Sequence, residues 1–336
     1  MKDGPILTIQ DLSTSFFTER GVLKAVDGVS FSVEPGEILG LVGESGCGKS
    51  VTSQSILRLY DEKHQVAYSG SIFFNGRDIL NIPKQQMKKI RGEQIAMVFQ
   101  DALSSLNPVY TVGNQIAETL MIHRKIKKAA AWEEAIELLR LVGIPDPVKR
   151  ISQFPHELSG GMRQRVMIAI ALACGPRLLI ADEPTTALDV TIQAQIMDLI
   201  VDLNRRLNMG VILITHDLAV VAETCRRVVV MYLGQIVEEA PVEELFDNPR
   251  HPYTLGLLKS IPHIDGDRKE GLYMIPGTVP LLNRIPQGCR FAGRCQYAES
   301  RCHGETQELR HYSEHHRVRC RKAADLGTGL GPKNAG

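Results

Sequence analysis

Short apolar runs and alternating stretches along the chain predict a domain built on β-sheet. Residues 6–10 and 29–33 alternate apolar and polar positions, and Pro35-Gly36 marks a turn. This pattern predicts antiparallel strands near the start of the chain. Ile38–Val42 is a continuous apolar run, which predicts a strand buried on both faces.

Three further apolar runs predict more strands of the buried kind. They lie at residues 95–99, 178–181 and 211–214. A helix-rich stretch, which includes residues 129–141, separates the first of them from the second. Strands and helices in this order predict an α/β fold with a mostly parallel sheet, and we assign residues 101–174 to a helical subdomain inserted into it.

The pattern changes near residue 250, where prolines begin to interrupt the chain and cysteines become frequent. The prolines are Pro252, Pro262, Pro276, Pro280 and Pro286. We therefore expect a first domain at residues 1–250, a small extension at 251–324 and a disordered tail at 325–336.

Composition narrows the class of protein. The chain has 336 residues, of which 43% are hydrophobic, and its formal net charge is +1. Because there is no excess of basic residues to neutralise phosphates, we expect no nucleic-acid partner. The start lacks the apolar core of a signal peptide, and no apolar run reaches the ~18 residues of a membrane-spanning helix. We therefore expect a soluble, cytosolic chain whose thiols stay reduced.

A glycine-rich segment, Gly43-Glu-Ser-Gly-Cys-Gly-Lys-Ser50, directly follows the predicted strand Ile38–Val42. This is the P-loop pattern in its expected context. The glycines let the backbone curl so that N–H groups face phosphates, and the next helix adds the positive end of its dipole. We expect Lys49 to reach the β- and γ-phosphates of a nucleotide and Ser50 to bind Mg²⁺. The alternative is a glycine-rich turn without a ligand, which the context disfavours.

An acidic pair, Asp182 and Glu183, follows the apolar run at 178–181. A P-loop needs an acidic partner for Mg²⁺ at the end of another buried strand, and we expect Asp182 to be that partner. Glu183 lies one residue further on and could polarise an attacking water as general base. A strand that merely ends in an acidic turn is the alternative.

A second anion site is predicted by Leu158-Ser-Gly-Gly-Met-Arg-Gln-Arg165, a Ser-Gly-Gly turn that opens a helix. One P-loop already covers one triphosphate, so a second cradle suggests a nucleotide held between two subunits. The segment resembles the signature motif of the ABC-type ATPases. That resemblance implies that Gln100 is the Q-loop glutamine, that Asp189 lies in the D-loop, and that His216 is the switch histidine that contacts the γ-phosphate.

The resemblance also implies a set of ATP contacts. Phe16 resembles the aromatic residue that stacks on adenine, with Phe17 and Tyr60 as alternatives. The expected ATP-binding residues are Phe16, Gly43, Ser45, Gly46, Cys47, Gly48, Lys49, Ser50, Val51 and Gln100. Those expected to hold Mg²⁺ are Ser50, Gln100 and Asp182, and those expected to reach the neighbouring subunit's nucleotide are Ser159, Gly160, Gly161 and Gln164.

Further segments make the resemblance more specific and extend it over the whole chain. Residues 100–108, Arg250-His-Pro-Tyr-Thr254, residues 275–280 and the cysteine-rich end are similar to ATP-binding subunits of oligopeptide/dipeptide importers, a subfamily shared with nickel importers. The chain departs from the family, which carries prolines at these positions, at Ala102, Arg290 and Gln296.

This resemblance implies a P-loop NTPase fold of the ABC type, with an antiparallel β subdomain, a helical subdomain and a small cysteine-rich C-terminal extension. The implied activity is ATP hydrolysis that powers import of short peptides, or of nickel or another small solute. The implied partners are a second ATPase subunit, usually in a heterodimer, two transmembrane permeases docked by residues 101–157, and an extracytoplasmic substrate-binding protein. The chain would lie peripherally on the cytoplasmic face of the cell membrane.

Two other classes of protein are disfavoured. Soluble ABC-type machines for DNA repair or translation usually carry a coiled-coil insertion or two modules in one chain, whereas this chain has one module and no long heptad run. A regulatory module that binds ATP without hydrolysing it would not need both Glu183 and His216.

The seven cysteines fall into two groups. Cys47 is expected to fill space within the P-loop, and Cys174 and Cys225 to be buried core thiols. The other four are Cys289, Cys295, Cys302 and Cys320, which lie within 32 residues. Each of these adjoins at least one of the arginines Arg290, Arg294, Arg301, Arg319 and Arg321.

The four late cysteines predict a [4Fe-4S] site. Structural zinc usually uses a Cys-x₂₋₄-Cys pair, which is missing here, whereas an iron–sulfur cluster tolerates wider spacing and its negative charge could be offset by the arginines. The resemblance includes such clusters in some members. Zinc remains an alternative, because histidines could complete a mixed site, and so do unliganded thiols. The histidines are His303, His311, His315 and His316. A bound cluster would also staple the small extension.

Overall fold

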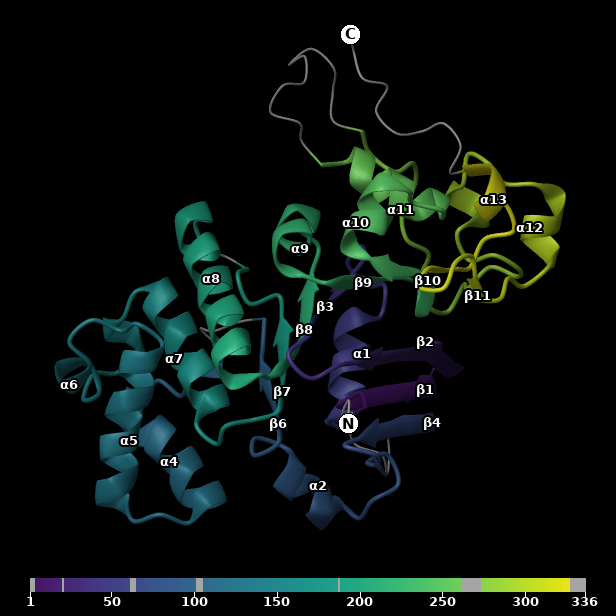
Figure 1. The fold of residues 1–336 in the computed structure, drawn as a ribbon. Coiled ribbons are helices and arrows are strands. Elements are labelled where there is room, and N and C mark those ends of the chain that lie inside the picture. Colours follow the sequence, from purple (N-terminus) through teal and green to yellow (C-terminus); the bar gives the residue numbers. More distant parts are fainter. Residues whose placement is uncertain are drawn as a thin grey trace, which may run out of the picture. The chain divides into compact units, whose positions relative to one another are not determined.

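The computed structural model describes residues 4–19, 21–60, 65–100, 105–186, 188–261 and 273–326. The chain forms two compact units. Figure 1 labels their helices and strands. The first unit comprises residues 1–7, 33–38 and 74–214, and the second comprises residues 8–32, 39–73 and 215–336.

Three parallel strands form the sheet of the first unit. They are β6 (Ile95–Val98), β7 (Leu178–Asp182) and β8 (Gly210–Thr215), with β7 between the other two. Every residue of β7 and β8 is buried, in agreement with their apolar sequences. The three buried strands predicted from these runs are thus confirmed. A short strand, β5 (Arg77–Asp78), belongs to the same unit.

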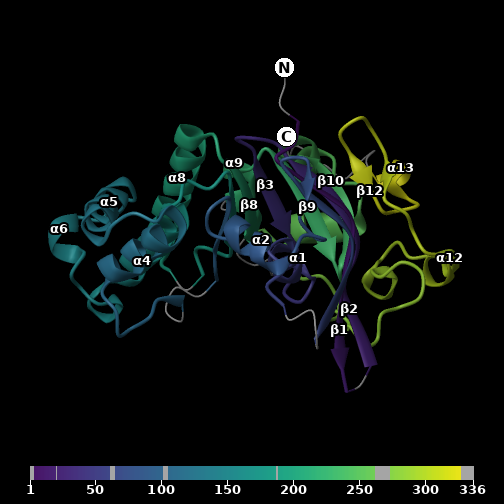
Figure 2. The same cartoon turned by 90° about the horizontal axis from the view of Figure 1, so that it is seen from below.

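Helices make up the rest of the first unit. α4 (Val112–Arg124) packs on α5 (Lys128–Leu141), whose buried positions Ala131, Ala135 and Leu138 lie on one face. The other helices are α2 (Lys84–Ile90), α6 (Pro147–Arg150), η1 (Pro155–Glu157), α7 (Gly160–Leu172) and α8 (Val190–Leu207). Figure 2 shows α4, α5 and α6 grouped together. The predicted helix at 129–141 is therefore confirmed as α5.

The second unit contains strands from the start and the end of the chain. β1 (Leu7–Thr18) lies between β2 (Gly21–Val33) and β4 (Val66–Phe74) in one sheet. In another, β3 (Ile38–Val42) runs parallel to β9 (Arg227–Tyr232), and β9 pairs antiparallel with β10 (Gln235–Pro241).

The C-terminal region adds the last two strands to that second sheet. β12 (Arg317–Val318) pairs antiparallel with β10, and β11 (Arg310–His311) pairs with β12. Residues 251–324 were predicted to be a separate extension, and part of that segment is joined to the sheet through backbone pairing. The domain boundaries at residues 250 and 324 remain a proposal.

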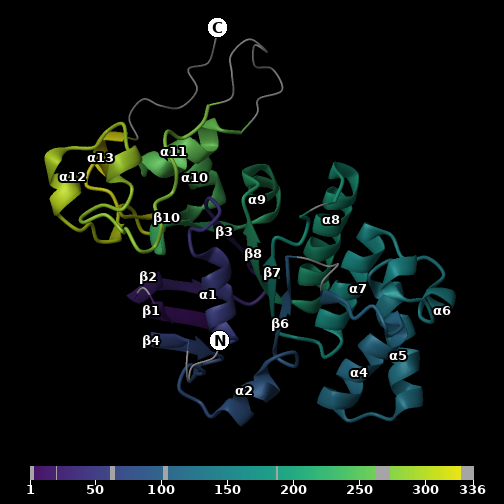
Figure 3. The same ribbon diagram turned by 180° about the vertical axis from the view of Figure 1, so that it is seen from behind.

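Short helices complete the second unit (Figure 3). They are α1 (Lys49–Ile56), α9 (Leu218–Thr224), α10 (Val242–Asp247), α11 (Pro252–Lys259), η2 (Ala292–Arg294), α12 (Ser300–Gly304) and α13 (Ala323–Leu326). Asp325 and Leu326, which were predicted to begin a disordered tail, end α13 instead, and residues 327–336 lie outside the described residues. Among the described residues, no helix has both the length and the apolar character needed to cross a membrane.

Candidate functional site

The segment Gly43–Ser50 forms a tight loop between strand β3 and helix α1. Its glycines adopt positive φ angles, 149° at Gly43 and 97° at Gly48. A Cβ atom would lie 2.3 Å from the Met231 carbonyl oxygen at Gly43 and 2.7 Å from the Ala25 carbonyl oxygen at Gly48. Both positions therefore require glycine, because a side chain would collide with backbone that cannot easily move.

Lys49 folds back into this loop. Its ammonium group donates hydrogen bonds to the carbonyl oxygens of Gly43 (2.7 Å) and Glu44 (3.0 Å), and the residue is only 5% exposed. The loop thus encloses a positive charge at the start of α1, where a helix terminus already favours anions. The neighbouring Ser50 and Val51 are half-buried, and Ser45 and Gly46 are exposed.

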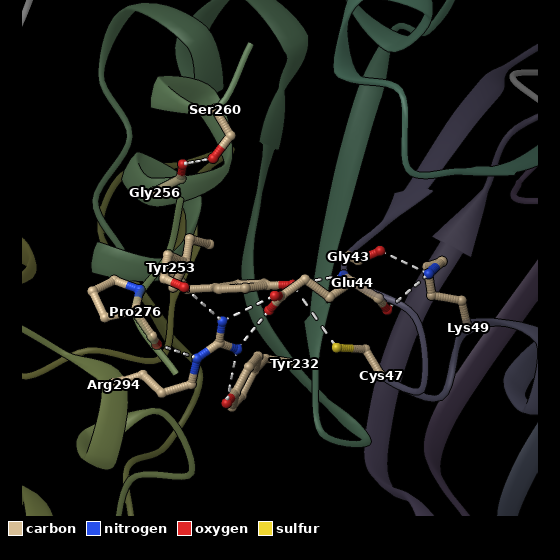
Figure 4. Close-up of polar contacts among 11 residues, drawn as sticks. Gly43, Glu44, Cys47, Lys49, Tyr232, Tyr253, Gly256, Ser260, Pro276 and Arg294 are labelled. Carbon is tan, nitrogen blue, oxygen red and sulfur yellow. Dashed lines mark hydrogen bonds and ion pairs between the residues drawn. The ribbon is translucent and has the colours of Figure 1, made fainter. Parts of the chain in front are cut away.

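Glu44, the second residue of the loop, is held at two points (Figure 4). Its carboxylate accepts two hydrogen bonds from the Arg294 guanidinium, Nη1 to Oε2 at 2.7 Å and Nη2 to Oε1 at 2.9 Å. Its backbone N–H donates to the Tyr253 hydroxyl oxygen at 2.7 Å. Two parallel charge-assisted bonds of this kind are among the strongest polar contacts in proteins.

Tyr253 and Cys47 form a buried, uncharged backing for the loop. Burial raises the pKa of the Tyr253 hydroxyl, and burial likewise raises the pKa of the Cys47 thiol. The two groups lie 3.8 Å apart, sulfur to oxygen. Cys47 is fully buried, which agrees with its expected space-filling role.

An aromatic cluster lies behind Tyr253. The Tyr253 ring lies 4.7 Å from the Tyr232 ring and 5.4 Å from the Phe291 ring, centroid to centroid. Phe291 also contacts Tyr232 edge-on and is 3% exposed. Since Phe291 lies between two of the late cysteines, the cluster packs the cysteine-bearing segment on the same residue that supports the loop.

In the first unit, Glu183 lies one residue beyond β7 in a left-handed backbone conformation, with φ of 46°. Its N–H donates to the Ile214 carbonyl oxygen. Its carboxylate Oε2 accepts from the Gln100 side-chain amide at 2.7 Å and from the Thr186 hydroxyl at 3.1 Å. Non-glycine residues rarely adopt such a φ, and those that do are concentrated at functional sites. Asp182, at the end of β7, is 3% exposed.

The Ser-Gly-Gly turn begins α7, also in the first unit. Ser159 is the N-cap and accepts from the Met162 N–H at 3.3 Å. Gly161 approaches α8 so closely that a Cβ atom would lie 2.7 Å from Ile192 Cγ2. Ser159 is exposed, whereas Gln164 is 3% exposed, and its amide nitrogen has no hydrogen-bond partner among the described residues.

The remaining predicted residues are placed as follows. Asp189 caps α8 by accepting from the Ile192 N–H. Ala102 lies outside the described residues. His216 is exposed and lines a cavity of about 470 Å³ together with Gly43 and Glu44.

The aromatic position near the start of the chain involves two rings. Phe16 and Tyr60 lie edge to face with centroids 4.8 Å apart, and Phe17 is 53% exposed. Phe16 and Tyr60, which the sequence offered as alternatives, thus form a single aromatic pair. The structure brings the loop, Lys49 and His216 together within the second unit, and Gln100 together with Glu183 within the first.

All four late cysteines line one small cavity of about 20 Å³. Burial raises the pKa of Cys289 and Cys295, and burial, reinforced by the other three thiols, raises the pKa of Cys320 to about 12. All seven cysteines are free thiols.

The donor type and the shared cavity fit a metal group, but the space is about that of one water molecule. Among the described side chains, no group of three or more histidines, cysteines, aspartates or glutamates is placed so that it could hold a metal ion. The structure therefore supports neither a [4Fe-4S] cluster nor zinc as placed.

The arginines beside the cysteines have other partners. Arg290 pairs with Asp27, and Arg294 pairs with Glu44. The expectation that these two arginines offset the charge of a cluster is wrong, because a carboxylate already neutralises each of them. Arg319 donates to the carbonyl oxygens of Ile236 and Gln307, and Arg321 pairs with Glu305.

The histidines proposed for a mixed zinc site do not line the thiol cavity. His303, His311 and His315 are exposed. His316 is fully buried between two carboxylates, with Nε2 2.8 Å from Glu238 Oε1 and Nδ1 3.0 Å from Glu244 Oε1. The histidine that does line the cavity is His251, from the segment Arg250-His-Pro-Tyr-Thr254. Its burial lowers its pKa to about 3, so the ring is neutral.

Three residues of this site were missed from sequence, namely Glu44, Tyr253 and Arg294. Tyr253 lies in Arg250-His-Pro-Tyr-Thr254, a segment that carries a family resemblance but no contact of its own, and Arg294 adjoins Cys295, which suggests the thiols as its partners. One signal in the sequence could have predicted such a partner, namely the Glu44 carboxylate inside a phosphate-binding loop. A carboxylate at that place needs a cation nearby.

The sequence of the chain matches two known protein families and several known proteins. Residues 26–186 match the family described as "ABC transporter", and residues 237–302 match "Oligopeptide/dipeptide transporter, C-terminal region". The chain is 52% identical over 321 residues to a probable peptide ABC transporter ATP-binding protein of Sinorhizobium fredii, covering 96% of each chain. It is 54% identical over 293 residues to the oligopeptide transport ATP-binding protein of Bacillus subtilis, covering 87% of this chain and 82% of that one.

Solved structures show the same fold. A dimeric ATP-binding cassette bound to ADP and Pi, in a post-hydrolysis state, has a TM-score of 0.63 and 26% identity, and the match covers 70% of this chain and 98% of that one. The protein cbiO1 from Clostridium perfringens, part of an ABC transporter complex, has a TM-score of 0.61 and 27% identity, covering 72% and 90%.

Proposed function

The chain belongs to the family of ATP-binding proteins of peptide-importing ABC transporters, and from this premise we propose that ATP bound at Gly43–Ser50 is hydrolysed with Glu183 as general base, driving import of short peptides. The observation that carries the proposal is the placement of Glu183. It directly follows the buried strand β7 in a left-handed conformation, and Gln100 and Thr186 fix its carboxylate. A carboxylate fixed in this way can accept the proton of an attacking water.

The remaining roles in this proposal follow from the local contacts. The Lys49 ammonium, now bonded to two loop carbonyls, would turn to the β- and γ-phosphates. Ser50, Gln100 and Asp182 would hold Mg²⁺, which supplies positive charge against the phosphates. His216 would contact the γ-phosphate, and the Phe16–Tyr60 pair would stack on adenine.

We propose further that a second ATPase subunit completes the nucleotide-binding site. Ser159, Gly160 and Gly161 would face that subunit's nucleotide, since the exposed Ser159 caps a helix whose N-terminus favours anions. Asp189 would lie at the same interface. Gln164 would join them only if its buried side chain moved outward.

Two transmembrane permeases are the generic partners of such a subunit. Residues 101–157 are proposed to dock them, and apolar side chains exposed in this segment support the assignment, with Val109 at 70%, Tyr110 at 53% and Ile122 at 64% exposure. The heterodimeric form, the extracytoplasmic substrate-binding protein and the peripheral position on the cytoplasmic face of the membrane are further parts of this proposal.

Reconstitution tests the proposed function. The chain, its partner ATPase and the two permeases would be placed in vesicles, and uptake of a labelled dipeptide or oligopeptide would be measured with and without ATP. We expect ATP-dependent uptake that is lost in the Glu183→Gln variant. ATP hydrolysis without uptake of any short peptide would reject the assigned substrate class and leave the ATPase assignment intact.

We propose separately that Cys289, Cys295, Cys302 and Cys320 bind a [4Fe-4S] cluster, which would require their cavity of about 20 Å³ to widen. The support is that all four thiols line one cavity. Protein purified without oxygen should absorb in the visible thiolate-to-iron region and contain iron and sulfide, and both should be lost in Cys302→Ser. A colourless sample with stoichiometric zinc would contradict the cluster and favour the alternative metal.

A further inference from the structure

Glu44 is the point where the phosphate-binding loop and the C-terminal region meet. Three groups converge on this residue, as Figure 4 shows. Lys49 binds its carbonyl oxygen, Tyr253 accepts from its N–H, and Arg294 binds its carboxylate. Two of these three partners come from beyond residue 250, so the C-terminal region defines the conformation of the loop at Glu44.

The ion pair between Arg294 and Glu44 is largely buried on the arginine side, and the arginine is held by other groups as well. The Arg294 side chain is 6% exposed and that of Glu44 30% exposed. Arg294 is itself fixed, because its Nε donates to the Pro276 carbonyl oxygen at 2.8 Å and its guanidinium lies 5.8 Å from the Tyr232 ring centroid. A guanidinium held by several groups loses little further freedom when it binds a carboxylate.

Charge gives this contact a consequence for nucleotide binding. A carboxylate in a loop that binds a triphosphate repels the ligand unless a cation neutralises it. Arg294 supplies that cation to Glu44 in a bidentate pair. Without Arg294, the loop would keep a negative charge beside the phosphates and would lose one of its two C-terminal attachments.

Arg294 also lies next to the cysteines in the sequence, so a movement of the cysteines would move Arg294. It ends η2 (Ala292–Arg294), which lies between Cys289 and Cys295, and it is followed directly by Cys295. Phe291, in the same segment, packs on Tyr253. A rearrangement of the thiols would therefore shift the short segment that carries Arg294, which contacts the loop, and Phe291, which packs on the loop's other partner Tyr253.

We propose that Arg294 is a positioning residue for the phosphate-binding loop, and that through Glu44 it makes the loop's affinity for ATP depend on the four-cysteine region. The proposal rests on the proposed nucleotide site at Gly43–Ser50 and adds a control on it from the C-terminal region.

Equilibrium binding of a non-hydrolysable ATP analogue with Mg²⁺ to the full chain tests this proposal. We expect Arg294→Ala to raise the dissociation constant about tenfold, and the defect to shrink at high salt because it is electrostatic. Glu44→Gln alone should change the constant less than threefold. The double variant should recover most of the lost affinity, because the unneutralised carboxylate is then absent.

The matched control is Arg317→Ala. Arg317 also joins the C-terminal region to a carboxylate, Glu239, and to a backbone carbonyl, that of Ser30, and neither of these two partners belongs to the loop. Both arginine variants should lower the melting temperature, and only Arg294→Ala should weaken binding of the analogue. Equal weakening in both, or none in Arg294→Ala, would show a purely structural role.

A second pair of variants tests the link to the cysteines. Cys295→Ser should weaken binding of the analogue in the wild-type background and have little added effect in Arg294→Ala. Unchanged binding in Cys295→Ser, or equal weakening in both backgrounds, would overturn the link. Lys49→Ala serves as the separate check on the site itself, since normal binding in that variant would reject the nucleotide site whatever Arg294 does.

Discussion

The Gln100 side-chain amide donates a 2.7 Å hydrogen bond to the Glu183 carboxylate, although 83 residues separate them in sequence. Gln100 follows β6 and Glu183 follows β7, and these strands are parallel neighbours. Their carboxyl ends therefore meet at one edge of the sheet, where ligand sites of open α/β sheets lie. The bond ties the residue proposed to bind Mg²⁺ to the residue proposed to activate water.

Glu183→Gln should reduce ATP turnover at least about 100-fold, because an amide cannot accept the proton of the attacking water. The amide can still bond to Gln100 and Thr186, so ATP binding should persist. Phosphate release and nucleotide titration measure the two effects. The control is Glu118→Gln, an exposed change on α4. Turnover at the wild-type rate in Glu183→Gln would remove Glu183 from the role of base.

Lys49→Ala should weaken nucleotide binding itself by about tenfold or more, since it removes the ammonium group that binds the carbonyl oxygens of Gly43 and Glu44 inside the loop. Binding of fluorescent ATP measures the loss. Lys88→Ala, an exposed lysine of α2, is the matched control and should bind normally. A turnover defect with unchanged affinity would place Lys49 in the chemical step instead.

Two adjacent glycines should respond oppositely to alanine. A Cβ at Gly161 would lie 2.7 Å from Ile192 Cγ2, so Gly161→Ala should destabilise the chain by about 1–3 kcal/mol through overpacking. A Cβ at Gly160 would meet Leu188 Cδ2 at 3.4 Å, an ordinary contact, so Gly160→Ala should be neutral or gain up to about 1 kcal/mol. Chemical denaturation compares the two, and equal effects would contradict the packing of α7 on α8.

Stability should fall at alkaline pH because of His316. Burial alone lowers its pKa, but hydrogen bonds and charge from Glu238 and Glu244 outweigh burial and raise it. A raised pKa means that the folded state holds the proton more tightly than the unfolded state. The contribution is therefore fully present below the ordinary value of about 6.5 and is lost as pH rises through the raised pKa.

Melting temperatures across pH, compared between wild type and His316→Gln, measure this contribution. The variant should be destabilised by about 3 kcal/mol or more at pH 6 and should lose much less stability on going to high pH. His315→Gln is the control, because the neighbouring His315 side chain is 71% exposed. A variant whose pH dependence matched that of the wild type would show that His316 is not the titrating group.

The strands that precede the nucleotide motifs could be predicted because each is an unbroken apolar run. The observed strands lie within one residue of their predicted positions; they are Ile38–Val42, Leu178–Asp182 and Gly210–Thr215. The loop after the first of these strands needs its glycines because a Cβ atom would collide with the backbone, and the motif shows these glycines directly. Such elements can be predicted because the apolar pattern and the backbone requirements are both local to the segment.

The contacts of Glu44 and of His316 could not be predicted in the same way. Both depend on where a charged side chain points after distant segments have packed. The spacing of residues along the chain does not predict that direction. The arginine at 294 illustrates the difficulty, since its neighbour Cys295 suggested one partner and the fold supplied another, 250 residues away. A charged residue that becomes buried needs a partner, but the sequence does not show which residue that partner is.

The attachment of Glu44 to Tyr253 and Arg294 has a consequence for the order of synthesis. A ribosome that has made residues 1–250 has completed every segment of the loop itself, but neither of these partners. The nascent loop therefore forms before its contacts with Tyr253 and Arg294 exist, and it gains them only after those residues have been synthesised. The contact with Arg294 closes a loop of 250 residues, which is slow compared with local folding. Chains truncated before residue 294 would carry an intact nucleotide motif with one charged residue left unmatched.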